Sequence, residues 1–137
     1  MEQMEQTDWD DLKELMASPY GSMRLKCDQF EVDLVQQTDS KTRKWVTSVY
    51  VDGYLKGEWS TAVDGEAKHE EARRFLRKVQ RRLYSAKQVE AYRKVAGKRE
   101  ANRLASKVYV YFLPSWSSFN SLKKHLLANN ASIERIH

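Results

Sequence analysis

Few side chains in this chain of 137 residues could act as nucleophiles or bases: it has one cysteine and three histidines. A catalytic cysteine needs a nearby base and a group that orients that base. Cys27 instead alternates with Met23 and Leu25, so we expect it to be a small core residue on a strand. A single cysteine forms no intrachain disulfide and, alone, no metal site. We expect solvated surface positions for the histidines, His69, His125 and His137.

One set of charged residues fits a metal-dependent nuclease. Such enzymes often pair an aspartate with a downstream acid-x-lysine, because carboxylates hold the divalent ion. Asp52 followed by Glu66-Ala67-Lys68 matches this pattern, although a glutamate at an expected helix start also suits the helix dipole. No phosphate-binding loop, dinucleotide fingerprint or serine elbow occurs in the sequence. We therefore expect no enzyme activity, no cofactor and no metal site, with a metal-dependent nuclease as the alternative.

Charge is strongly segregated along the sequence. Residues 1–72 hold 8 Lys/Arg and 16 Asp/Glu, a balance of −8, whereas residues 73–107 hold 13 and 2, a balance of +11. Residues 108–137 hold 3 and 1, which brings the net charge to +5. Arginine suits phosphate because its planar fork donates two hydrogen bonds at once. The basic segment thus indicates either a polyanion-binding surface or a solvated helix face whose charge the acidic half offsets.

The basic residues are expected to lie on helices. Over residues 65–84, apolar side chains recur at helical spacing on one side and basic ones cover the other. Ser85 and Gln88 form a capping-box signature for a second helix over 86–96, Gly97 is a C-cap, and residues 98–105 add further helix. The candidate nucleic-acid or partner-binding residues are Arg73, Arg74, Arg77, Lys78, Arg81, Arg82, Lys87, Arg93, Lys94, Lys98, Arg99 and Arg103.

The remaining elements are expected to be mostly strands. A short helix over 8–17, capped by Thr7, precedes alternating stretches near 22–27, 30–34, 45–51 and 54–59. The turn signal Asp52-Gly53 joins the last two, because both positions of this turn need positive φ. After the basic segment come a strand over 107–113 buried on both faces, a helix that starts at Ser117 or Ser118 and ends near 129–130, and a strand that includes Ile133 and Ile136.

This order favours an α+β fold in a single domain over residues 1–137. We expect an antiparallel four-stranded meander, then basic helices and a C-terminal β-α-β segment. No apolar run approaches the roughly 18 residues of a membrane helix, and the acidic N-terminus is unlike a signal peptide, so we expect a cytoplasmic protein. One face of the last hairpin is mixed, covered either by another element or by a partner at a second interface: Trp45, Val49, Val51 and Tyr54.

Tyr109 and Tyr111 alternate on the expected strand over 107–113. Aromatic residues in this arrangement can form a platform on which nucleic-acid bases stack. An alternating Tyr/Val strand is, however, more often part of a core. Both interpretations stay open at this point.

A resemblance to a known group rests on residues 9–25 (WDDLKELMASPYGSMRL), 51–53, 56–59, 83–87, 122–126 and 132–134. Together these stretches, which span most of the chain, resemble small phage and prophage proteins of unassigned function. The resemblance implies an accessory role in a mobile element and transfers no functional residues.

Two hypotheses of different classes follow. In the first, a non-catalytic phage or mobile-element accessory protein binds DNA, RNA or a nucleoprotein complex through the Arg-rich helical face. In the second, an anti-CRISPR-like inhibitor binds a host defence complex through protein-protein contacts. The first predicts salt-dependent nucleic-acid binding that Arg74→Glu, Arg77→Glu and Arg81→Glu together abolish.

Overall fold

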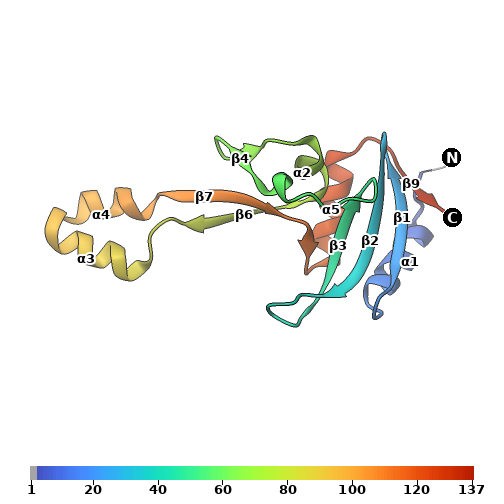
Figure 1. Cartoon of the computed structure of the whole chain (residues 1–137), viewed down its shortest axis with the longest axis horizontal. Coiled ribbons are helices and arrows are strands. Elements are labelled where there is room, and N and C mark those ends of the chain that lie inside the picture. The colour runs from blue at the N-terminus through green and yellow to red at the C-terminus, as the bar shows by residue number, and fades with distance from the viewer. Residues whose placement is uncertain (1–2) are drawn as a thin grey trace.

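The protein, described over residues 3–137 by a computed structural model, has a rounded body and one long arm that projects from it (Figure 1). Helices and antiparallel sheets make up both parts, which confirms the predicted α+β class. None of the helices in residues 3–137 is long and apolar enough to cross a membrane.

A five-stranded sheet forms the centre of the body, in the order β8-β3-β2-β1-β9 with every neighbouring pair antiparallel. A tight turn with a φ of 52° at Asp28 joins the first two strands, and a second one, with φ of 51° at Asp52 and 81° at Gly53, follows the third strand at the position that the sequence predicts. The strands are β1 (Ser22–Cys27), β2 (Phe30–Thr38), β3 (Trp45–Val51), β8 (Ser115–Trp116) and β9 (Ile133–Ile136).

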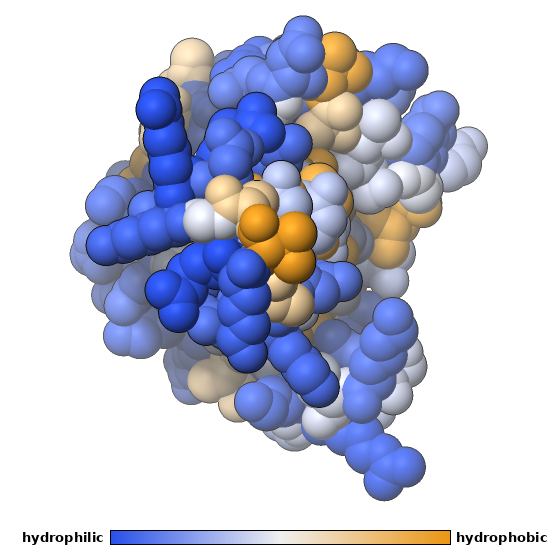
Figure 2. All heavy atoms as spheres, turned by 90° about the vertical axis from the view of Figure 1, so that its left-hand side faces the viewer, coloured by the Kyte–Doolittle hydropathy of each residue, from blue (hydrophilic) through white to orange (hydrophobic). Residues whose placement is uncertain are grey.

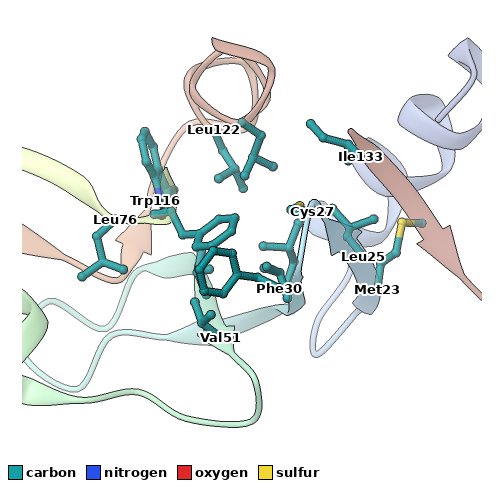
Figure 3. Close-up of a cluster of buried hydrophobic side chains, with 14 of the residues drawn as sticks. Met23, Leu25, Cys27, Phe30, Val51, Leu76, Trp116, Leu122 and Ile133 are labelled. Carbon is teal, nitrogen blue, oxygen red and sulfur yellow. Dashed lines mark hydrogen bonds between the residues drawn. The ribbon is translucent and has the colours of Figure 1, made fainter. Parts of the chain in front are cut away.

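Three helices cover one face of this sheet: α1 (Gln6–Met16), α2 (Glu70–Phe75) and α5 (Phe119–Asn129). The strands present every second residue to that face, and Phe30 packs edge-to-face on Phe75 of α2 with ring centroids 5.6 Å apart. Part of this core is drawn in Figure 3, with Leu122 of α5 above the strand residues Cys27 and Val51. Cys27 is fully buried, as its alternating strand predicts.

The arm consists of a two-stranded antiparallel ribbon and a helical hairpin at its outer end (Figure 1). The ribbon pairs β6 (Arg77–Arg82) with β7 (Val108–Leu113), and the hairpin is formed by α3 (Ala86–Ala96) and α4 (Lys98–Ala105). The main hydrophobic core has no member between Leu76 and Phe112 among the residues described. The helical hairpin and the adjoining end of the ribbon, which we call the outer arm, therefore lie outside the core that stabilises the body.

The predicted helix over 65–84 is wrong. Only Glu70–Phe75 is helical, and the next segment is strand β6, preceded by the short hairpin of β4 (Ala62–Val63) and β5 (Glu66–Ala67). Arginine, lysine and glutamine favour helices locally. Pairing with β7 supplies a complete ladder from Arg77 to Arg82, and this long-range pairing outweighs the local preference.

The predicted fourth meander strand over 54–59 is also wrong. The hairpin ends at a single bridge between Val51 and Tyr54, and η1 (Gly57–Ser60) follows as a 3₁₀ helix. The free edge of β3 is instead occupied by β8, which arrives from the C-terminal part of the chain. This leaves Trp59 to turn into the core, where it is 4% exposed.

The other expected elements are close to those observed. The capping box of Ser85 and Gln88, the end of α3 at Gly97 and the helix over 98–105 are confirmed. The first helix begins earlier than predicted, because Glu5 and Asp8 form its capping box in place of the predicted cap Thr7. β7 occupies the predicted position, but it is buried only towards the body and exposed at its outer end.

Candidate functional site

The arm, residues 77–113, concentrates the positive charge in space as well as in sequence. It holds 11 Lys/Arg and 2 Asp/Glu, a balance of +9, while the rest of the chain holds 13 and 17, a balance of −4. Figure 2 looks at the molecule from the arm end, where long hydrophilic side chains fan out around the tip. The charge difference therefore coincides with a difference in shape: a basic arm extends from an acidic body.

Many basic side chains of the arm have no ionic partner. Arg93 and Arg103 each pair with a glutamate one helical turn earlier, Glu90 and Glu100, at 2.9 and 2.8 Å. Such exposed pairs contribute only about 0–1 kcal/mol and can open to a stronger anion. The following arm residues make no ion pair with any residue in 3–137: Arg77, Arg81, Arg82, Lys87, Lys94, Lys98, Arg99 and Lys107.

Arg73 and Arg74 were predicted to belong to the basic surface, but the structure places them in the body. Arg74 is 16% exposed, and its guanidinium bonds Asp28 at 2.6 Å and Glu70 at 2.7 Å while lying 5.4 Å from the ring centre of Phe30. Arg73 pairs with Glu70 as well. The two guanidinium groups hold the pKa of Glu70 down to about 2. Arg74 is therefore held within the body by its carboxylate partners, whereas Arg73 lies half exposed beside it.

Asp28 is the centre of this structural network. One carboxylate accepts N–H groups from Ala131 and Ser132, at 3.1 and 3.0 Å, in addition to the guanidinium of Arg74. The hydrogen bond from Arg74 is the largest cause of a lowered pKa at Asp28. Because Arg74→Glu would place a third carboxylate beside those of Asp28 and Glu70, the triple variant proposed from the sequence would disrupt the body as well as the arm. A loss of nucleic-acid binding by this triple variant could not be assigned to the arm.

The β6-β7 register gives the ribbon two different faces. Opposite residues of an antiparallel pair share a face, and successive residues alternate between faces. Arg81 is opposite Tyr109, and Val79 is opposite Tyr111. The backbone hydrogen bond from Leu83 to Lys107 extends this register by one step. We call the resulting surface the tyrosine face, composed of Arg77, Val79, Arg81, Leu83, Lys107, Tyr109, Tyr111 and Leu113.

The helical hairpin at the tip has almost no core of its own. No residue of α3 is buried, and Ala101 is the buried residue of α4. Val95, next to the turn between the helices, is 87% exposed. Figure 2 shows hydrophobic atoms at the centre of this end view, surrounded by hydrophilic side chains. Such a weakly packed unit should open locally more readily than the body.

The predicted second interface is divided by the fold. Val49 and Val51 are fully buried under the helices, so an element of the chain covers this face and these two valines cannot contact a partner. Trp45 and Tyr54 lie outside that cover and are 41% and 62% exposed. Trp45 meets Tyr20 edge-on at 5.2 Å. The four residues therefore do not form one surface.

The residues considered for catalysis have different surroundings in the fold. Burial raises the pKa of Cys27 to about 12, which keeps its thiol protonated. Asp52 accepts the backbone N–H of Glu31 at 3.0 Å, and Glu66 lies 3.8 Å from Lys78. In residues 3–137, no group of three His, Cys, Asp or Glu side chains is placed to hold a metal ion.

His125 was expected to be a solvated surface residue, but the structure leaves it only partly exposed. Its ring packs against Trp116 at 5.1 Å, and Nε2 lies 3.0 Å from the backbone oxygen of Arg73. Its neighbours in the sequence are two lysines, which gave no sign that the ring packs against Trp116. His137 is exposed, as expected, and His69 is partly buried at the start of α2.

One arm residue was missed by sequence reasoning. Lys107 immediately precedes β7 and was left out of the basic set because that set was drawn from helices. The alternation of residues 107–113 carried the signal, since Lys107 shares a face with Tyr109.

Comparison with protein-family models, curated proteins and solved structures finds no match to this chain.

Proposed function

We propose that this protein binds nucleic acid through its arm, the β6-β7 ribbon together with α3 and α4. The observation that supports the proposal is the balance of +9 on a projecting arm against −4 on the body. Phosphate contacts by Lys and Arg supply most nonspecific nucleic-acid affinity. Repulsion between the acidic body and a phosphate backbone would direct the arm, rather than the body, towards the ligand.

The types of element in the arm suit this ligand. A DNA major groove, about 12 Å wide, admits either an α-helix or a two-stranded ribbon. The arm has a ribbon along its length and short helices at its end, with basic residues on both. The proposed Arg-rich surface thus consists of a ribbon and a helical tip, in place of the one long helix that the sequence predicts.

The biological setting is part of the same proposal. We infer a non-catalytic accessory role in a phage or another mobile element, exercised in the cytoplasm of a bacterial host. The ligand is DNA, RNA or a nucleoprotein complex. The alternative, an inhibitor that binds a host defence complex by protein contacts alone, stays a prediction that the following experiment separates from the first.

The test is a fluorescence-anisotropy titration with labelled duplex and single-stranded oligonucleotides over a salt series. Lys87→Glu, Lys94→Glu and Lys98→Glu together reverse three exposed tip charges that make no ion pair in residues 3–137. We expect roughly tenfold or greater loss of affinity at about 0.1 M salt. The slope of log K against log salt should shrink by about 2 to 3, since each lost phosphate contact removes nearly one unit.

A matched control reverses three exposed body lysines, Lys13, Lys41 and Lys124, with the same change in net charge. This control should retain most of the affinity. Equal losses in both triple variants would show that net charge alone matters and would reject the arm as the site. No binding by the wild-type protein at low salt would reject nucleic-acid binding altogether, and co-purification with a host defence complex would then favour the inhibitor.

A further inference from the structure

The outer half of the tyrosine face, towards the tip, exposes aromatic surface that is not part of the hydrophobic core. Tyr109 is 47% exposed and lies outside the hydrophobic core. Its ring stacks on that of Tyr111, with centroids 5.8 Å apart and planes inclined by 19°. The core interpretation of this strand therefore does not hold for Tyr109, whose ring rests on one neighbour and is open to solvent.

Arg81 lies opposite Tyr109 and contacts Tyr111, on whose ring Tyr109 stacks. Its Nε donates to the hydroxyl of Tyr111 at 3.4 Å. A guanidinium has five N–H donors, and this contact uses one of them. Arg81 makes no ion pair with the described residues, so its terminal nitrogens can meet a phosphate next to the tyrosine rings.

The neighbouring positions extend the same chemistry towards the tip. Leu83, 52% exposed, and Lys107 follow on the same face, beyond Arg81 and Tyr109. The face thus combines flat apolar surface with cationic groups on both sides of it. Bases in a duplex are already stacked and offer only their edges, whereas an unpaired base has a free π-face and a flanking phosphate.

We propose that the tyrosine face binds single-stranded nucleic acid, with one unpaired base stacked on Tyr109 and a neighbouring phosphate held by Arg81. This inference rests on the proposed function of the arm and adds the class of ligand. The ribbon supplies the stacking platform, and the basic tip supplies phosphate contacts that duplexes and single strands share.

The experiment compares Tyr109→Ala with the wild-type protein on a labelled oligo-dT of about 20 nucleotides and on a mixed-sequence duplex of the same length. Loss of one stacked base should lower single-strand affinity by roughly 5- to 100-fold. Duplex affinity should change by less than about twofold, because duplex contacts are made by charges elsewhere on the arm. Tyr109→Phe, which keeps the ring, should bind oligo-dT like the wild type.

Tyr54→Ala is the matched control, since Tyr54 is an exposed body tyrosine that also has a cation nearby, Lys56 at 5.4 Å. It should leave both affinities unchanged. Equal effects of Tyr109→Ala on single strands and duplex, no effect on either, or a Tyr109→Phe variant as weak as Tyr109→Ala would each overturn base stacking while leaving arm binding intact. Wild-type protein that binds neither probe would overturn both proposals together.

Discussion

At the scale of single residues, His125 shows how position in the fold sets chemistry. The carbonyl oxygen of Arg73 can only accept, so Nε2 of His125 carries the proton and donates at 3.0 Å. Nδ1 then accepts from the amide of Asn129 at 3.3 Å. Burial lowers the pKa of His125 below its usual value of about 6.5, because the charged ring is less well solvated here. The neutral ring therefore stabilises the contact between α5 and α2.

This environment predicts a pH-dependent stability. Between the lowered folded pKa and about 6.5, the unfolded chain binds a proton that the folded chain does not. The contribution of His125 is therefore present above about pH 6.5 and is lost as the pH falls below it. Thermal unfolding should show a melting temperature that declines from pH 7.5 towards pH 5.5, by roughly a few degrees.

The control for this prediction is His125→Gln, which can still donate to Arg73 but does not titrate. Its melting temperature should decline less over the same range. A decline that is the same in His125→Gln and in the wild type would assign the effect to other groups.

At the scale of elements, the helical tip depends on the turn between α3 and α4. Gly97 has a φ of 91° and a ψ of 170°, a conformation that side chains with a Cβ rarely adopt. Its N–H bonds the carbonyl of Arg93, and its own carbonyl accepts from Ala101. One residue thus ends α3 and begins α4, and the sequence identified it correctly.

Gly97→Ala should loosen the tip without unfolding the body. The strained backbone costs roughly 1–3 kcal/mol. Amides of residues 86–105 should then exchange hydrogen about 5- to 150-fold faster, while the global melting temperature changes by less than about 2 °C. Gly57→Ala is the control, because Gly57 has no positive φ and a Cβ there meets nothing within 4 Å. Faster exchange throughout the body would contradict the independence of the tip.

The elements also show where prediction from sequence succeeds. The helices α3 and α4 have their signals within a few residues: Ser85 and Gln88 at one end, Gly97 at the junction. The strand β6 has none, because Val79 and Leu83 fit a helical spacing as well as a strand. Its partner β7 lies some thirty positions further along the chain, as the pairing of Arg81 with Tyr109 shows. Local patterns cannot contain that information.

At the scale of the whole molecule, the body and the outer arm have separate physical tasks. The body contains the core, and the outer arm carries charge that would oppose compaction if it were folded against itself. Projection into solvent keeps like charges apart and leaves them accessible. The arm therefore adds an exposed basic surface at little cost to the stability of the body.

Replacement of residues 84–106 by Asn-Gly tests this division. Leu83 and Lys107 are joined by a backbone hydrogen bond, so a two-residue turn can close the ribbon there. The segment removed has 6 Lys/Arg and 2 Asp/Glu, which lowers the net charge from +5 to +1. We expect cooperative thermal unfolding within about 5 °C of the wild type and at least tenfold weaker binding to oligonucleotides. An unfolded product would show that the tip contributes to the core.

The sequence by itself determined the α+β class, the tight turn at Asp52-Gly53, the helices α3 and α4 and the basic character of residues 73–107. Each depends on composition or on neighbours within one or two turns of chain. The tertiary structure alone decided that β8 rather than residues 54–59 pairs with β3, and that Arg74 is bound by Asp28 while Arg81 stays outside. Those outcomes depend on which of several distant segments pairs with a strand edge or a carboxylate at the lowest free energy. The whole chain takes part in that competition.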